Sequence, residues 1–219
     1  EFSIRDVERF TEEVLKFLDI RFDPPYEKLL DTSNGVELPT WLSGAGLNIT
    51  EMCLDRWQTD EMKNQLAVIW EGEEGATRIF TYRELKRSVC DFAFSLFHEG
   101  IRRGDAVGIH LPMQIETVVA LLAINRIGAI AVPVFSGYGI DAISSRLEAV
   151  AARALITTYG FTRRGKHFDA LTIASRAVVG IDSIKSVVVI PPIDTDAPGI
   201  AENYTGIDAH LAETERLQN

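Results

Sequence analysis

Beyond residue 65, the chain alternates between two hydrophobic patterns. Short apolar runs are typical of buried strands, whereas longer segments with apolar residues every three or four positions are typical of helices. The runs predicted as strands are LAVIWE (66–71), TRIF (77–80), AVGIHL (106–111), AIAVPVF (129–135), ALITT (154–158) and KSVVVI (185–190). Because strands that alternate with helices form βαβ units, this pattern predicts an α/β fold with a parallel sheet flanked by helices.

Helices are predicted between these strands, and the first has the clearest boundaries. Thr81 as N-cap and Glu84 three residues later form a capping box, and Gly100 ends the helix. Asp141 is expected to cap a later helix in the same way. The predicted helices are residues 81–100, 114–128, 141–151 and 166–179.

The two ends of the chain do not follow this alternation. Residues 1–65 are predicted as a helical and irregular N-terminal extension, with a helix at residues 5–18 followed by a segment rich in Pro, Gly, Asn and Asp. Residues 191–219 are acidic and contain several prolines, which indicates a linker or a truncated element. We therefore expect three parts: an extension packed on the core (1–65), an α/β subdomain (66–190) and this terminal linker (191–219).

Charge is distributed unevenly along the chain. Its 219 residues carry 32 acidic and 22 basic side chains, for a formal net charge of −10. Residues 76–190, however, hold 14 basic against 9 acidic residues, between two acidic flanks. Two interpretations remain open: a solvated acidic surface around a neutral-to-basic domain, or contact between the middle segment and an anion. The cations are too few, and too little interleaved with aromatic residues, to indicate nucleic-acid binding.

Composition also limits the location of the protein. The most apolar stretch is interrupted by Asn125, Arg126 and Pro133, and no basic leader precedes an apolar core near residue 1, so we expect neither a membrane span nor a signal peptide. Cys53 and Cys90 are expected to be buried free thiols in a reducing compartment. These features predict a soluble cytoplasmic protein without disulfides. The sequence has no cluster of Cys and His residues, so no metal site is predicted.

Two loops follow predicted strands and are the candidate ligand-binding segments. Because ligands of open parallel sheets bind beyond the carboxyl ends of the strands, residues 135–139 (FSGYG) and 159–166 (YGFTRRGK) should share one edge. The first loop offers aromatic rings and glycines, and the second offers cations just before a predicted helix start, where free N–H groups suit a phosphate. The alternatives are an ordinary tight turn and a solvated basic turn.

The familiar catalytic motifs are missing from the sequence. It contains no GxxxxGK[ST] phosphate loop, no GxSxG and no HExxH, and the two glycines of residues 136–139 are a weak dinucleotide fingerprint. We therefore assign no catalytic residue and no metal ligand.

Several segments nevertheless resemble a known family. WLSGAGLNITEMCLDRW, then LAVIWEGEEGATRIFTYREL with GDAVGIHLPM, and then ALLAINRIGAIAVPVFSGYG are similar, in order and spacing, to acetyl-CoA synthetases. These are AMP-forming acyl-CoA synthetases of the adenylate-forming superfamily. The resemblance covers residues from about 40 to 190.

The resemblance implies a two-step ligase. ATP and a carboxylate give an acyl-adenylate and pyrophosphate with Mg²⁺, and coenzyme A (CoA) then gives the thioester and AMP. In this family the matching loops contact CoA, which implies that Phe135 and Gly137 face its adenosine end or the opening for its pantetheine arm. Arg163 and Lys166 would meet its phosphates, with Arg164 as a helper.

The resemblance also has departures. Ser136 stands where the family has glycine, and Met52 precedes Cys53 where the family has asparagine. The family's ATP phosphate loop, magnesium-binding segment and carboxylate pocket are not found, so we expect an N-terminal fragment of a longer enzyme for acetate or another short acid, inactive alone. The alternatives are a non-catalytic nucleotide- or CoA-binding module and a purely structural subdomain. Exposed apolar surface would promote self-association.

Overall fold

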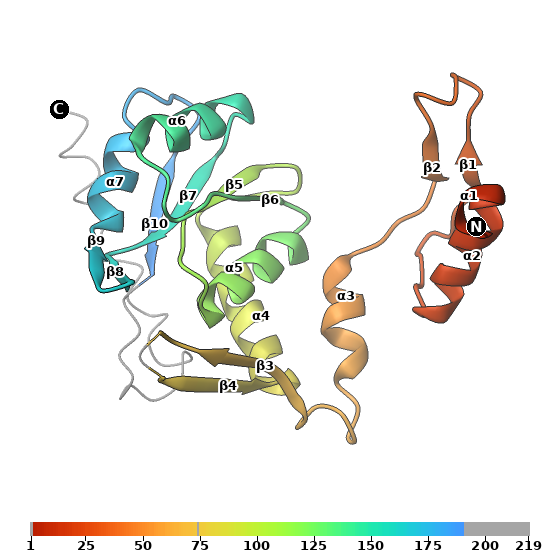
Figure 1. The fold of residues 1–219 in the computed structure, drawn as a ribbon, viewed down its shortest axis with the longest axis horizontal. Helices are drawn as coiled ribbons and strands as arrows, with labels where there is room; N and C mark the ends of the chain where they lie inside the picture. Colours follow the sequence, from red (N-terminus) through yellow and green to blue (C-terminus); the bar gives the residue numbers. More distant parts are fainter. Residues whose placement is uncertain (1, 74, 191–219) are drawn as a thin grey trace. The chain divides into compact units, whose positions relative to one another are not determined.

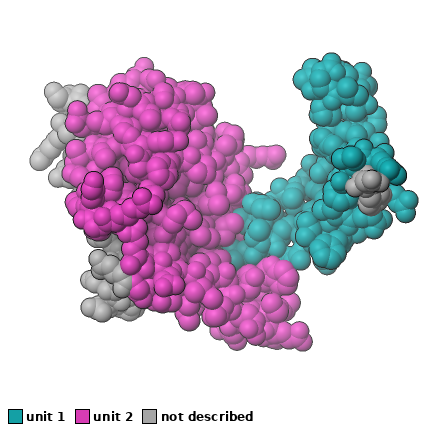
Figure 2. Space-filling model, in the orientation of Figure 1, with its two compact units in different colours: residues 1–56 teal, residues 57–219 magenta. Residues whose placement is uncertain are grey.

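Figure 1 shows the computed structural model of the chain, which describes residues 2–73 and 75–190. The chain divides into two compact units, residues 1–56 and 57–219, which Figure 2 distinguishes by colour. Each unit is described by itself below. The expected linker at residues 191–219 lies outside the described residues.

The first unit contains the expected N-terminal helix and a hairpin that the sequence pattern did not reveal. Asp6 caps helix α2 by accepting a hydrogen bond from the Arg9 backbone N–H, with 3.0 Å between nitrogen and Oδ1. None of the residues of α2 is buried. The elements are α1 (Phe2–Arg5), α2 (Val7–Phe17), the antiparallel pair β1 (Lys28–Asp31) and β2 (Thr40–Ser43), α3 (Ile49–Cys53) and the short 3-10 helix η1 (Asp55–Trp57), whose last residue belongs to the second unit.

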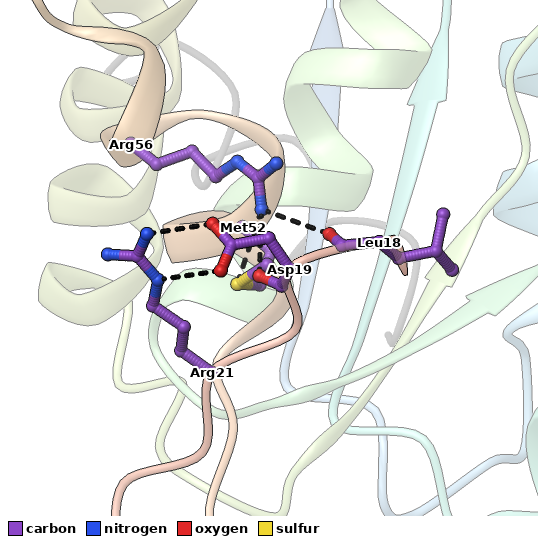
Figure 3. A network of polar contacts seen from close by, with 5 residues as sticks. All are labelled: Leu18, Asp19, Arg21, Met52 and Arg56. Carbon is purple, nitrogen blue, oxygen red and sulfur yellow. Dashed lines mark hydrogen bonds and ion pairs between the residues drawn. The ribbon is translucent and has the colours of Figure 1, made fainter. Parts of the chain in front are cut away.

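A polar network joins the last residue of the first unit to the turn after α2 (Figure 3). The Arg56 guanidinium donates to the backbone oxygens of Asp19, at 3.1 Å, and Leu18, at 3.4 Å. Arg21 donates two hydrogen bonds to the Asp19 carboxylate, at 2.7 and 3.2 Å. These bonds lower the pKa of Asp19. Arg56, the middle residue of η1, thereby fixes the turn that follows α2, where the Asp19 φ of +49° is in the left-handed region.

The second unit is built on a four-stranded parallel sheet, so the predicted fold class is confirmed (Figure 1). Its strands lie in the order β10-β7-β5-β6. Ile109, at the end of β5, is aligned with Pro133 on one side and Ile156 on the other. All residues of β5 and β7 are buried, as the unbroken apolar runs predicted. The bounds are β5 (Ala106–Ile109), β6 (Ile130–Pro133), β7 (Ala154–Thr158) and β10 (Ser186–Ile190).

Helices cover both faces of this sheet. The capping box of Thr81 and Glu84 is present at the start of α4. Helix α4 packs on α5, and α6 packs on α7. The chain moves outward from β5 to β6, then crosses back to β7, and right-handed crossovers therefore place α5 on one face and α6 and α7 on the other. The bounds are α4 (Tyr82–His98), α5 (Ile115–Arg126), α6 (Ile140–Ala149) and α7 (Ala170–Ala177).

Two antiparallel hairpins lie outside the main sheet. The first pairs β3 (Leu66–Glu71) with β4 (Thr77–Thr81), and the second pairs β8 (Phe161–Arg163) with β9 (Lys166–Phe168). The prediction that β3 is a buried strand is wrong, because its residues are exposed or half-buried.

Three local predictions are also corrected. Residues 166–168 form a strand, so the last helix begins at Ala170. Gly139 occupies the N-cap of α6 without a side-chain hydrogen bond, so Asp141 is not its cap. Cys53 is exposed and Cys90 is half-buried, so neither is fully buried as expected, although both are free.

Close packing on one face of the sheet depends on a glycine in β5, Gly108. Leu147 of α6 and Leu155 of β7 are fully buried. A Cβ atom on Gly108 would lie 2.6 Å from Leu147 Cδ2 and 2.8 Å from Leu155 Cδ1. The absence of a side chain at residue 108 therefore lets α6 approach the middle of the sheet.

Candidate ligand-binding cleft

A cleft of about 1180 Å³ opens at the carboxyl ends of the parallel strands. β5 and β7 are neighbours whose following segments lead to opposite faces of the sheet, and open α/β sheets bind ligands at such a reversal of strand order. The walls come from the ends of β5 and β6, the loop after β6, the turn between β3 and β4, and the β8–β9 hairpin; they include Trp70, Glu73, Ile109, Phe135, Tyr138 and Arg163.

The loop after β6 supplies aromatic rings to the cleft. Phe135 is 52% exposed, and its ring meets the half-buried Tyr138 ring edge to face, with centroids 5.4 Å apart. The Arg146 guanidinium lies 4.3 Å from the centre of the Tyr138 ring and donates a hydrogen bond to the Ala142 backbone oxygen. The arrangement holds the Tyr138 ring in place, and the exposed part of Phe135 is available to a flat ligand.

The cations of the second loop lie on a tight hairpin turn. Arg164 and Gly165 have φ angles of +50° and +71°, and positive φ at both central positions defines a type I′ turn. The rings of Phe161 and Phe168 stack across the strands, 5.2 Å apart. We call residues 163–166 the basic turn. On this turn Arg163 is half-buried, and Arg164 and Lys166 are exposed.

The structure brings together the residues that the sequence singled out. The Arg163 guanidinium lies over the Phe135 ring, 5.1 Å from its centre, which joins the two loops. Gly137 contacts the same ring, since a Cβ there would lie 2.6 Å from Phe135 Cε1. Phe135 and Arg163 line the cleft. Arg164 and Lys166 are on the same turn as lining residues but are not in the lining itself.

The expected helix start does not contribute to a phosphate site. The Asp169 carboxylate caps α7 by accepting hydrogen bonds from the Thr172 backbone N–H, at 3.0 Å, and from its hydroxyl, at 2.7 Å. These bonds lower the pKa of Asp169. The helix terminus is therefore already occupied by an anion of the chain, so a ligand phosphate at this edge would meet the basic turn rather than the helix start.

Sequence reasoning missed several groups around the cleft. Trp70 of β3 donates from Nε1 to the Met113 backbone oxygen at 2.7 Å. Glu116, at the start of α5, is buried and pairs with Arg78 of β4 at 2.9 Å. The available signal was an acidic residue, Glu116, in the first turn of a largely apolar helix. The sequence alone could not show that Arg78 is its partner.

His110 is a second buried titratable group near the cleft. It directly follows β5, is fully buried, and lies 3.3 Å from the Thr157 hydroxyl. Burial lowers the pKa of His110, and a hydrogen bond with the Ser136 backbone opposes that shift. The imidazole therefore lies between the ends of β5 and β7 and the loop that carries Phe135.

Within residues 2–73 and 75–190, no group of three or more His, Cys, Asp or Glu side chains is placed to hold a metal ion. No helix in that part of the chain is both long and apolar enough to cross a membrane.

An open parallel sheet with reversed strand order and a cleft at that reversal defines a doubly wound α/β protein. The chain belongs to the AMP-binding enzyme family, because the sequence profile of that family matches residues 55–214. It is 40% identical over 150 residues to an acetyl-coenzyme A synthetase of Chlorobaculum tepidum, covering 68% of this chain and 23% of that protein. It is 34% identical over 197 residues to an acetyl-coenzyme A synthetase of Pyrobaculum aerophilum, covering 86% and 29%.

A solved structure gives the same result for the fold. The acetoacetyl-CoA synthetase from Streptomyces lividans superposes with a TM-score of 0.78 at 29% identity, covering 90% of this chain and 30% of that one. The resemblance drawn from the sequence motifs is thereby confirmed. The chain spans less than a third of the length of these relatives.

Proposed function

We propose that this chain provides the coenzyme-binding loops of an AMP-forming acyl-CoA synthetase. The nucleotide end of CoA rests on Phe135 beside Gly137, and its phosphates meet Arg163 and Lys166, with Arg164 assisting. The observation that supports this is the stacking of Arg163 on Phe135 at the rim of the cleft, 5.1 Å from guanidinium carbon to ring centre. One contact thus places a cation beside an aromatic surface, the two features that a phosphorylated nucleotide requires.

The complete enzyme would join a carboxylate to CoA with ATP and Mg²⁺, and acetate or another short acid is the substrate class we propose. The described residues fit the coenzyme, because they offer both cations and an aromatic face. They do not include a carboxylate cluster for a metal ion. We therefore assign these residues the binding and orientation of CoA, and we expect the 219-residue chain alone to be inactive.

Calorimetry with CoA and dephospho-CoA tests the proposed site. The two ligands differ by the 3′-phosphate, so binding of CoA that weakens without this group indicates contact between phosphate and cations. A charged hydrogen bond contributes about 1.5–3 kcal/mol at best, so we expect CoA to bind roughly tenfold more tightly than dephospho-CoA. Equal affinities would exclude recognition of the 3′-phosphate. No heat with either ligand would exclude the coenzyme site.

The inactivity of the isolated chain has its own test. Acetate-dependent exchange of labelled pyrophosphate into ATP reports the adenylation step. We expect no exchange above a blank with protein of verified mass. Exchange that depends on both acetate and this chain would contradict the proposal.

A structural role is the second candidate, and one contact favours it. The Arg164 backbone N–H donates to the Glu73 carboxylate, 2.6 Å away, so the basic turn already has an acidic partner within the second unit. A subdomain whose basic turn makes only internal contacts of this kind would give no heat with CoA, which separates this candidate from the first.

We extend the proposal to location and association. Free Cys53 and Cys90 suit the reducing cytoplasm. Ile69 and Ile79 are neighbours on the β3–β4 hairpin and are 66% and 54% exposed, which supports self-association of the chain. Light scattering over a concentration series tests this, and a constant monomer mass would contradict it. We propose no nucleic-acid or membrane partner.

A further inference from the structure

The basic turn is connected to a distant acidic turn. Glu73 lies in the turn between β3 and β4, and Arg164 lies in the turn between β8 and β9, 91 residues further along the chain. Glu73 Oε2 accepts a hydrogen bond from the Arg164 backbone N–H at 2.6 Å. Glu73, Arg163 and Gly165 all line the same cleft. The contact therefore lies at the cleft itself, among the residues of the candidate site.

A carboxylate already accepts a hydrogen bond from the backbone of the basic turn. The type I′ geometry of Arg164 and Gly165 makes a sharp turn, and the amide of Arg164 is taken by Glu73 rather than left to solvent. A phosphate oxygen and a carboxylate oxygen compete for the same kind of donor, because both are anionic acceptors. The negative charge of Glu73 also opposes a second negative charge close by.

We propose that Glu73 is an internal anion that competes with ligand phosphate for the basic turn and so sets its affinity. This inference rests on the proposed coenzyme site. When no ligand is bound, the Glu73 carboxylate holds the turn in the shape that receives phosphate. When a phosphate arrives, it takes the Arg164 amide, and Glu73 moves into solvent, which its exposed position permits. Glu73 thereby discriminates against weakly charged ligands, which cannot displace it.

Substitution of Glu73 by Gln tests this directly, with Glu71→Gln as the matched control. Glu71 is also exposed, belongs to the same hairpin and lines the same cleft. Each variant therefore removes one negative charge from the same part of the cleft wall. Exposed charged contacts contribute up to about 1 kcal/mol, so E73Q should bind CoA roughly two- to fivefold more tightly than the parent, and E71Q should change less. Urea unfolding confirms that each variant is folded.

Three results would overturn the inference. Equal gains in E73Q and E71Q would show only a general charge effect. Unchanged affinity in E73Q would show that no competition occurs. Weaker binding in E73Q would show that Glu73 supports the site rather than opposing the ligand.

The proposed function can fail separately, and a second measurement then decides the role of Glu73. If neither the parent chain nor E73Q binds CoA, the coenzyme site is excluded. Inorganic pyrophosphate is then titrated while the Arg164 amide is followed by ¹H–¹⁵N NMR. A lower apparent Kd at this amide in E73Q than in the parent supports the competition. The same Kd in both, or no response in either, overturns it.

Discussion

The Phe135 ring lies where a side chain on Gly137 would begin, since a Cβ there would be 2.6 Å from Phe135 Cε1. Gly137→Ala should therefore displace the ring and its contact with Arg163. Because Phe135 is 52% exposed and can move outward, we expect a loss of stability below about 1 kcal/mol. CoA affinity measured by calorimetry should fall about threefold to tenfold.

Gly139→Ala is the matched control for that substitution. No atom lies within 4 Å of a Cβ on Gly139, so this variant should keep both the ring position and the affinity. An equal loss of affinity in both variants would mean that flexibility of the loop, rather than the position of Phe135, controls binding.

Arg163→Ala should weaken CoA binding about tenfold while leaving dephospho-CoA less affected, because it removes a cation beside the ligand phosphates. Arg153→Ala is the control, since Arg153 is exposed and directly precedes β7, at the amino ends of the strands and away from the cleft at their carboxyl ends. Calorimetry with both ligands gives the comparison. A similar loss in Arg153→Ala would indicate general attraction to positive charge.

Arg164→Asn should keep or increase stability even though it removes a cation. Arginine at a φ of +50° carries strain, whereas asparagine followed by glycine is preferred in type I′ turns. We expect the free energy of unfolding to rise by up to about 1 kcal/mol in urea titrations. A decrease of that size would show that the Arg164 side chain stabilises the fold, contrary to its exposed position.

Arg78→Ala should destabilise the second unit strongly, because it leaves the buried Glu116 carboxylate without the cation 2.9 Å away. The Arg78 side chain is 21% exposed, so we expect a loss of about 2–4 kcal/mol rather than the full cost of an unpaired buried charge. Equilibrium unfolding in urea measures it. The double variant Arg78→Met with Glu116→Leu should recover most of the loss, and no recovery would assign the effect to lost packing.

His110 should make the stability of the chain depend on pH. Burial lowers the pKa of His110 below its ordinary value of 6.5, so the unfolded chain binds more protons than the folded one below that pH. The free energy of unfolding should therefore fall as pH drops below 6.5, by at most about 1.4 kcal/mol per pH unit from this group. His110→Gln should reduce the slope, with His98→Gln as control, and an unchanged slope in His110→Gln would contradict the assignment.

The strands of the central sheet were predictable because the signals for them lie within short stretches of sequence. β5 and β7 are buried on both faces, and the resulting apolar runs are visible without knowledge of their neighbours. The capping box of Thr81 and Glu84 fixed the start of α4 for the same reason, since both partners lie within one turn. The family motifs then agreed with the pattern.

The β8–β9 hairpin was not predictable from local sequence. Residues 166–168 are too short a segment to stand out and lead directly into a helical pattern. The turn also uses Arg164 before Gly165, where an Asn-Gly pair would have signalled a hairpin. The strand order also depends on crossovers that the sequence does not encode locally.

The position of the candidate site was predictable from the sequence, but some of its contacts were not. Placing both loops at one edge of the sheet followed from strand direction, and the Arg163–Phe135 contact agrees with it. The Glu73–Arg164 hydrogen bond was not foreseen, because it joins turns 91 residues apart and depends on how two hairpins pack. The helix start expected beside the cations was wrong, since a β-strand intervenes.

The reversed strand order has a consequence for synthesis on the ribosome. β5 can pair with β6 soon after both emerge, but its other edge must wait for β7, roughly 45 residues further along the chain. At cellular translation speeds this takes on the order of a few seconds. During that interval an apolar strand that ends up in the middle of the sheet has one side open, and this is the period in which a nascent chain would recruit chaperones.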